Sequence, residues 1–272
     1  MSTPRAVTYR SAAGTALTAD LRHPGGPEPV PVVVLAHGGA WKMGARGDYD
    51  GWARVLTAAG FATLSVDYTL ATDDTPSWPA AADDVAAAFR LLWTQRDRLG
   101  VDPARTGCLG TSAGAHLLAT AALTQDTGCQ AAVLVNGVYD LRPQHAYSAT
   151  RPFNAVELLM GGPPSALGAR YAAASPVRLA AGSGLAAGIA WTIVYGERDP
   201  VVPPLEQSGG FAAALSAAGA DVTLVGVPEA THFWNTAVAV DAWPNTAIRD
   251  LVVNRLTAAL APVAPGPTEV AP

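Results

Sequence analysis

The feature that most constrains the fold of this chain is an alternation of short apolar runs with helical patterns. The apolar runs, rich in Val, Ile, Leu and Ala, occupy residues 32–36, 61–66, 105–109, 131–135, 189–195 and 222–227. Helical patterns lie between or after them, at residues 48–59, 79–98, 205–218 and 243–260, and a further one ends at Leu123. Continuous β-branched runs are typical of strands buried on both faces of a parallel sheet. The sequence therefore predicts an α/β fold with a mostly parallel central sheet and helices on both faces.

Two segments fall outside this alternation. Residues 7–10 and 16–21 flank a Ser-Ala-Ala-Gly turn, a pattern that predicts an antiparallel hairpin before the first parallel strand. Residues 141–175 carry Pro, Gly and aromatic side chains where one crossover helix would suffice, so we expect a small cap-like excursion over the sheet. We predict a single domain over residues 1–260 and a Pro-rich disordered tail over residues 261–272.

Composition excludes several classes of partner. Although 50% of the residues are hydrophobic, no apolar run approaches the roughly 20 residues that a membrane-spanning helix needs. The net charge of −5 and the lack of basic clusters argue against nucleic acid as a partner. No metal-ligand spacing of His, Cys and Asp and no glycine-rich phosphate loop occurs, so we expect neither a metal nor another cofactor.

The expected location of the protein is the cytoplasm. The start of the chain is polar and lacks the apolar region of a secretory signal. Two cysteines are too few for a disulfide framework. We interpret Cys108, in a predicted strand, and Cys129, in a predicted loop, as free thiols in a reducing compartment.

The Gly110-Thr111-Ser112-Ala113-Gly114 motif links a predicted strand to a predicted helix and fits the G-x-S-x-G pattern. A strand that reverses sharply into a helix holds its apex residue in a strained conformation. Glycines two positions away on each side remove side chains that would collide with the neighbouring elements. The apex hydroxyl then lies at the C-terminal edge of the sheet, beside a helix N-terminus whose dipole favours negative charge. Ser112 is therefore the predicted nucleophile.

A serine nucleophile needs a base that accepts its proton, and for this motif the chain order is Ser, then Asp or Glu, then His. Three histidines follow the serine in the sequence. We expect His116, on the same helix, to be structural and His145, in the excursion, to lie at the surface. His232 follows the last predicted strand by a short loop, where its ring would reach the serine. It is the predicted base.

The acid that orients the base is predicted to be Asp199, which follows the strand at residues 189–195. Asp140 is the alternative, because the loop after the strand at residues 131–135 opens on the same edge of the sheet. Exchange of each residue for asparagine would distinguish the two.

Acyl chemistry also needs N–H donors for the tetrahedral oxyanion. One predicted donor is the amide of Ala113, directly after the nucleophile. The others are the amides of Gly39 and Ala40, in the His-Gly-Gly-Ala-Trp segment that follows an early strand. Within this segment Gly38 would permit the bend, and His37 is interpreted as a structural support.

Four segments together resemble the α/β-hydrolase superfamily. They are His-Gly-Gly-Ala-Trp at residues 37–41, Gly-Thr-Ser-Ala-Gly-Ala-His at 110–116, Asp-Pro-Val-Val-Pro at 199–203 and His-Phe at 232–233. Within that superfamily the chain is similar to small esterases of the hormone-sensitive-lipase, feruloyl-esterase-like and kynurenine-formamidase-like branches. The resemblance implies the α/β-hydrolase fold and serine hydrolase chemistry.

One stretch departs from the lipase-like pattern Asp-Tyr-Arg-Leu-Ala-Pro. Residues 67–72 read Asp-Tyr-Thr-Leu-Ala-Thr, so that Thr69 replaces the arginine and Thr72 the proline. An ion pair is thereby expected to be lost. The loss bears on the branch and the substrate, while the predicted catalytic residues are untouched.

The predicted function is hydrolysis of a carboxylic ester of a small or medium apolar acyl compound, through an acyl-enzyme that water resolves. The candidate pocket walls are the aromatic residues Trp41, Tyr68, Trp78, Tyr147, Phe153 and Trp234. An arylformamidase or other amidase is the close alternative. A lyase or cyclase that uses the same triad pocket without hydrolysis belongs to a different class, and a binding module without activity to a third.

Overall fold

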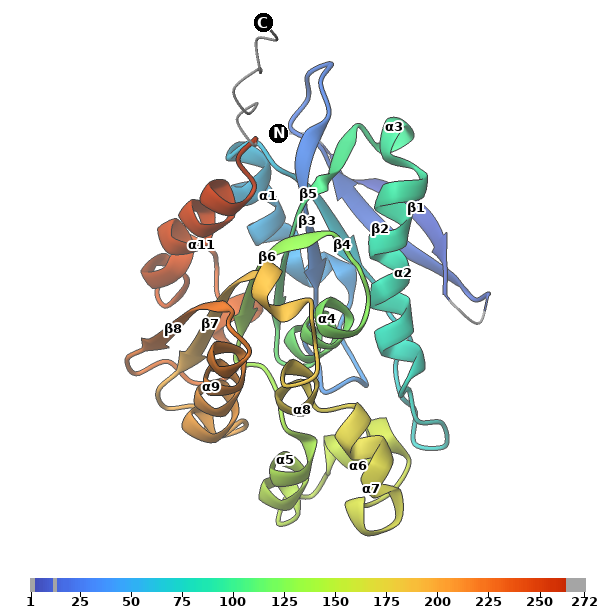
Figure 1. Cartoon of the computed structure of the whole chain (residues 1–272), viewed down its shortest axis with the longest axis vertical. Helices are drawn as coiled ribbons and strands as arrows, with labels where there is room; N and C mark the ends of the chain where they lie inside the picture. Colours follow the sequence, from blue (N-terminus) through green and yellow to red (C-terminus); the bar gives the residue numbers. More distant parts are fainter. Residues whose placement is uncertain (1–2, 12–13, 263–272) are drawn as a thin grey trace, which may run out of the picture.

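The computed structural model describes residues 3–11 and 14–262 of the chain (Figure 1). Within these residues one sheet contains eight strands in the order β1-β2-β4-β3-β5-β6-β7-β8. The strands are β1 (Arg5–Arg10), β2 (Ala16–Arg22), β3 (Val30–Ala36), β4 (Ala62–Val66), β5 (Val101–Thr111), β6 (Cys129–Val135), β7 (Ala190–Gly196) and β8 (Asp221–Val227). The first two form an antiparallel hairpin, β2 is antiparallel to β4, and all other pairs are parallel. The predicted hairpin and mostly parallel sheet are confirmed.

Helices cover both faces of this sheet (Figure 1). The longer ones are α1 (Asp50–Ala58), α2 (Ala80–Thr94), α4 (Ala113–Thr124), α9 (Gly210–Ala217) and α11 (Asn245–Ala259). Those of the excursion and of the segment after it are α5 (Leu141–Ser148), α6 (Ala155–Met160), α7 (Pro164–Ala173) and α8 (Pro176–Ala180). Short helical pieces are η1 (Arg46–Tyr49), α3 (Arg96–Leu99), η2 (Ala186–Gly188), η3 (Leu205–Gly209) and α10 (Trp234–Ala237). None of the helices described here has the length and hydropathy that crossing a bilayer requires.

Strand β3 shows why the apolar runs have no polar alternation. Successive side chains of a strand point to opposite faces of a sheet. Val32, Val34 and Ala36 therefore pack in the cluster that contains α2, α4 and α9. Val33 and Leu35 pack in the cluster that contains α1 and α11. Each face of this strand meets a helical layer, and none of its side chains can be polar without entering a core.

Some predicted bounds differ from those in the structure. The helix expected over residues 79–98 is divided, because Gln95 leaves the helical conformation (φ −126°, ψ 20°) between α2 and α3. Cys129 was predicted in a loop, and this is wrong: it is the first residue of β6 and pairs with Thr106 of β5. Its sulfur lies 3.8 Å from that of Cys108, and both thiols are free and buried.

The cap-like excursion predicted at residues 141–175 contains α5, α6 and α7. These helices lie together at one end of the molecule, at the bottom of Figure 1. The chain then returns through α8 to the helical layer beside α4 and α9. From residue 263 onward, the predicted tail lies outside the described residues.

Candidate active site

Ser112 occupies the turn between β5 and α4, as the motif predicts. Its backbone is left-handed (φ 52°, ψ −117°), a conformation that costs a non-glycine residue about 1–3 kcal/mol. The amide of Ser112 donates to the carbonyl of Val135 in β6 at 2.9 Å. A Cβ atom on Gly114 would lie 2.1 Å from the carbonyl oxygen of Ala36, so only glycine permits this approach of α4 to β3. The turn is thus fixed from two neighbouring strands.

The three predicted triad residues lie in one chain of hydrogen bonds. His232 Nε2 is 2.9 Å from Ser112 Oγ, and His232 Nδ1 is 2.6 Å from Asp199 Oδ2. The other carboxylate oxygen accepts from the amides of Val201 and Val202 at 2.8 and 2.9 Å. Because a carboxylate only accepts, the proton of the neutral ring lies on Nδ1. Nε2 is then free to take the serine proton, which is the arrangement that nucleophilic attack requires.

Asn136, for which the sequence predicted no catalytic part, holds the loop that carries His232. Its side-chain amide donates to the carbonyl of His232 at 2.7 Å, and its side-chain oxygen accepts from the amide of Gly196 at 2.8 Å. Its backbone is also left-handed (φ 48°). A polar residue directly after a buried strand is the signal in the sequence that points to it.

Asp140, the alternative acid, does not bond to His232 in the described residues and instead lies at the start of α5. It is the N-cap of α5, where its Oδ1 accepts from the amide of Arg142 at 3.3 Å and lies 3.5 Å from the hydroxyl of Ser175. None of its hydrogen bonds in the described part of the chain reaches His232. His145, expected at the surface, is half-buried inside the cap and lies 3.2 Å from a carboxylate oxygen of Glu157.

The loop that carries the predicted oxyanion donors has three left-handed residues in succession. Their φ angles are 115° at Gly39, 55° at Ala40 and 57° at Trp41. A Cβ on Gly39 would lie 2.1 Å from the carbonyl oxygen of Met43, so this position requires glycine. Among the described residues, no hydrogen bond uses the amide of Gly39 or Ala40 as donor. The amide of Ala113, at the first turn of α4, has no acceptor within its own helix either.

His116, on α4, forms hydrogen bonds that connect this loop and the cap to that helix. The indole N–H of Trp41 donates to His116 Nδ1 at 3.1 Å. Nε2 of the same ring, 2.8 Å from the carbonyl of Ala174, donates at the end of α7. Both ring nitrogens are therefore engaged within the protein, in agreement with the structural role expected for this residue.

His116 should make the stability of the protein depend on pH. Burial lowers its pKa from 6.5 to about 4, and the hydrogen bond to Ala174 offsets only part of this effect. Because the unfolded chain binds a proton at higher pH than the native state, the contribution is complete above about pH 6.5 and is lost as the pH falls towards 4. Between pH 7 and 4.5 the unfolding free energy of the wild type should fall by about 2 kcal/mol more than that of His116→Gln. Urea denaturation of both proteins at the two pH values measures the difference. Equal losses of unfolding free energy would contradict the lowered pKa of His116.

A cavity of about 140 Å³ opens at Ser112. Trp41 and Phe153, two of the six predicted aromatic walls, line it. Its other lining residues are Ala40, Val138, Gln144, Ser148, Arg151, Ala155, Val156, Val201 and Val202. The cavity is thus largely apolar, with few polar groups.

The other four predicted wall residues are not part of the lining of this cavity, because they have structural contacts. Tyr68 is buried, stacks on His37 at 4.3 Å and donates its hydroxyl to the His37 carbonyl at 2.9 Å. Trp78 packs at 6.0 Å from the ring of His116, between α2 and the cap. Tyr147 is exposed and donates to the carbonyl of Pro200 at 3.1 Å. Trp234 belongs to the core beneath α1 and α11.

The residues that the structure describes contain no group of three or more His, Cys, Asp or Glu side chains placed to hold a metal ion. The arrangement at Ser112 combines a hydroxyl, an imidazole, a carboxylate and the amides of Gly39 and Ala40, which donate no hydrogen bond within the described residues. These are the parts that acyl transfer through a covalent intermediate needs.

Comparisons with known proteins give a consistent picture. A family model described as BD-FAE matches residues 20–215. Esterase LipQ of Mycobacterium tuberculosis is 31% identical over 225 residues, which make up 77% of this chain and 52% of LipQ. Carboxylesterase NlhH of the same organism is 40% identical over 101 residues, 36% of this chain and 31% of NlhH. The chain therefore spans about half the length of LipQ and less of NlhH.

Solved structures resemble the whole described fold. Carboxyl esterase 2 (TmelEST2) of Tuber melanosporum superposes with a TM-score of 0.77 at 25% identity, covering 95% of this chain and 87% of that one. The carboxylesterase EstE1, cloned from a metagenomic library, gives 0.80 at 23% identity, with 96% and 90% covered. The second likeness concerns the fold alone.

Proposed function

Because the chain belongs to the BD-FAE family and has the α/β-hydrolase fold, we propose that it is a serine esterase that cleaves carboxylic esters of small or medium apolar acyl compounds. The observation that carries the proposal is the hydrogen-bond chain from Ser112 through His232 to Asp199. The names of LipQ and NlhH, an esterase and a carboxylesterase, support the same chemistry.

In the proposed mechanism Ser112 Oγ attacks the ester carbonyl while His232 Nε2 takes its proton. Asp199 keeps the ring oriented and stabilises its charged form. The amides of Ala113, Gly39 and Ala40 donate to the oxyanion of the tetrahedral intermediate. His232 then returns the proton to the leaving alcohol, which leaves an acyl group on the serine. Water, activated by the same ring, hydrolyses this acyl-enzyme and restores the free serine.

The apolar lining of the cavity at Ser112 supports an apolar acyl group. The lining of the cavity includes the valine side chains of residues 138, 156, 201 and 202. Its charged side chain is that of Arg151. A buried charged acyl group would find few partners there, at a considerable desolvation cost. We also propose a cytoplasmic location. The free thiols of Cys108 and Cys129 support it, because thiols stay reduced in that compartment.

The test is turnover of nitrophenyl esters of graded chain length beside N-formylkynurenine, with a fluorophosphonate probe for the serine. An esterase should hydrolyse the short esters and bind the probe covalently at Ser112. Faster hydrolysis of N-formylkynurenine than of every ester would identify a formamidase instead. Labelling without any hydrolysis would favour lyase or cyclase chemistry, and absence of labelling would indicate a binding module.

A further inference from the structure

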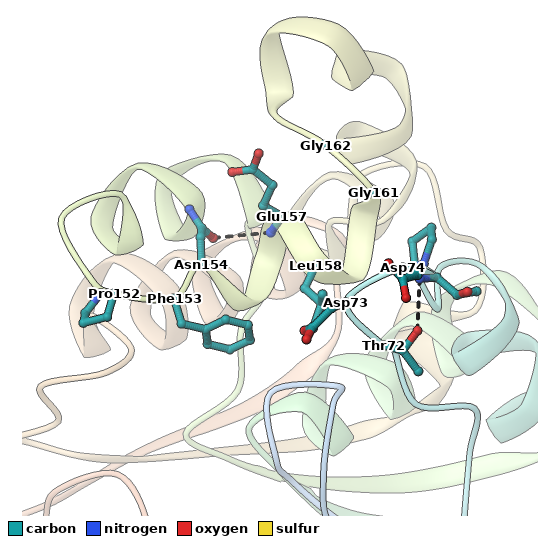
Figure 2. A pocket seen from close by; sticks show the side chains of 12 residues that line it. Thr72, Asp73, Asp74, Pro152, Phe153, Asn154, Glu157, Leu158, Gly161 and Gly162 are labelled. Atoms are coloured by element: carbon teal, nitrogen blue, oxygen red, sulfur yellow. Dashed lines mark hydrogen bonds between the residues drawn. The ribbon is translucent and has the colours of Figure 1, made fainter.

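A second, larger pocket, the outer pocket, lies next to the cavity at Ser112, the inner cavity. It has a volume of about 500 Å³ and is formed by residues 72–76 on one side and by cap residues 152–154, 157–158 and 161–162 on the other (Figure 2). Phe153 lines both spaces. The two are therefore neighbours, and Phe153 is the residue that they share.

The cap segment 151–158 forms the wall between the two spaces. The residues of the segment that line the inner cavity with Phe153 are Arg151, Ala155 and Val156. The residues that line the outer pocket with it are Pro152, Asn154, Glu157 and Leu158. Figure 2 shows the Phe153 ring directed into the outer pocket. One thin segment of chain thus presents one set of side chains to each space.

Contacts from both sides hold Phe153. The ammonium group of Lys42 lies 5.2 Å from the centroid of its ring and 2.7 Å from a carboxylate oxygen of Asp73. Lys42 directly follows Trp41, in the loop that carries the predicted oxyanion donors (the oxyanion loop). The Phe153 ring is therefore held from the side of the catalytic centre. On the cap side, Asn154 caps α6 by accepting from the amide of Glu157 at 3.3 Å. The backbone next to Phe153 is thereby fixed.

The inner cavity is on the acyl side of the proposed reaction. Its walls include Ala40 and Trp41 of the oxyanion loop, whereas His232, which must protonate the departing alcohol, is not among them. The acyl chain therefore extends from the ester carbonyl carbon, which becomes bonded to Ser112 Oγ, into this cavity. A volume of about 140 Å³ is well below the roughly 300–1,000 Å³ of drug-sized ligand pockets, so only a short chain fits.

We propose that Phe153 is a specificity-determining residue that limits the length of the acyl chain by closing the inner cavity against the outer pocket. The proposal rests on the proposed ester hydrolysis. Removal of the ring would join the two spaces. The distal methylenes of a longer chain would then enter a pocket whose apolar side chains include Pro76, Pro152 and Leu158 and whose charged side chains are Asp73, Asp74 and Glu157. Each methylene that becomes buried contributes about fourfold to binding.

The experiment compares Phe153→Ala with the wild type on nitrophenyl acetate, butyrate and octanoate. The ratio of kcat/KM for octanoate to that for butyrate should rise at least about tenfold, since these acyl chains differ by four methylenes. Phe153→Leu, which keeps part of the apolar volume, should give an intermediate ratio. Trp93→Ala is the matched control, because Trp93 is 42% exposed, like Phe153 at 41%, but lies on α2 away from both spaces.

An unchanged octanoate-to-butyrate ratio in Phe153→Ala, with acetate still hydrolysed and Tm retained, would overturn the proposed partition, in which Phe153 separates the inner cavity from the outer pocket. Loss of folding in Phe153→Ala would transfer the same criterion to Phe153→Leu. If the wild type hydrolyses no ester, the proposed function fails. The partition is then decided by the rates at which ethyl and octyl fluorophosphonates modify Ser112, read by intact mass. A selective gain for the octyl reagent in Phe153→Ala supports it, and equal rates or no modification overturn it.

Discussion

Replacement of Ser112 by alanine is expected to lower kcat for ester hydrolysis by about six orders of magnitude, because the covalent route is lost entirely. Some activity above the uncatalysed rate should remain, since the oxyanion donors at Ala113, Gly39 and Ala40 still contact the carbonyl. The fold should not change. Alanine meets the same backbone strain at φ 52°, and the hydroxyl that is lost bonds to His232.

Hydrolysis of nitrophenyl acetate, together with fluorophosphonate labelling followed by intact mass, measures this effect. Ser216→Ala is the control, because Ser216 is exposed on α9. It should keep wild-type turnover and full labelling. Turnover of Ser112→Ala within tenfold of the wild type, or labelling at another residue, would show that the nucleophile lies elsewhere.

The second large effect is expected at the acid. Asp199→Asn should lower kcat by about four orders of magnitude. An asparagine in this position can present an N–H to the ring, which would then carry its own proton on Nε2 and could no longer accept one from Ser112. The backbone amides of Val201 and Val202 can still bond to the side-chain oxygen, so the loop should keep its place.

Asp140→Asn is the matched control for this exchange, because it is the same chemical change at the alternative acid. Asparagine is as good an N-cap as aspartate, so α5 should remain intact and kcat should change by about threefold at most. Measurement of kcat for both variants decides between the two residues. A loss in Asp140→Asn comparable to that in Asp199→Asn would contradict the assignment of the acid.

The strands of this fold could be predicted closely because most are buried on both faces. In β3 every position from Val32 to Ala36 lies in a core, so the sequence shows an uninterrupted apolar run. The end of a helix is set by weaker local preferences, and the break at Gln95 between α2 and α3 has no glycine or proline to mark it. Cys129 was misplaced for a related reason: a strand that begins in a polar neighbourhood has no apolar signal at its first residue.

The candidate site divides in the same way. Ser112, Asp199 and His232 could be proposed from chain order and strand ends, since parallel strands bring their carboxyl ends to one edge of the sheet. The aromatic walls could not, because aromatic side chains fill cores as readily as pockets. Tyr68 and Trp234 are examples of core packing. Asn136 acts through a side chain that bridges loops 60 and 96 residues away, and no local pattern encodes such a bridge.

The hydrogen bonds of His116 also have a consequence for how this protein can evolve. They fasten the end of α7, at Ala174, to the same ring that supports Trp41, so this part of the cap cannot shift without disturbing the oxyanion loop. The earlier part of the cap, around residues 151–158, has no such bond to His116. Substitutions there can reshape the wall of the cavity and leave the donors for the oxyanion in place. Under the proposed function, selection can therefore change which ester is accepted without rebuilding the chemistry that cleaves it.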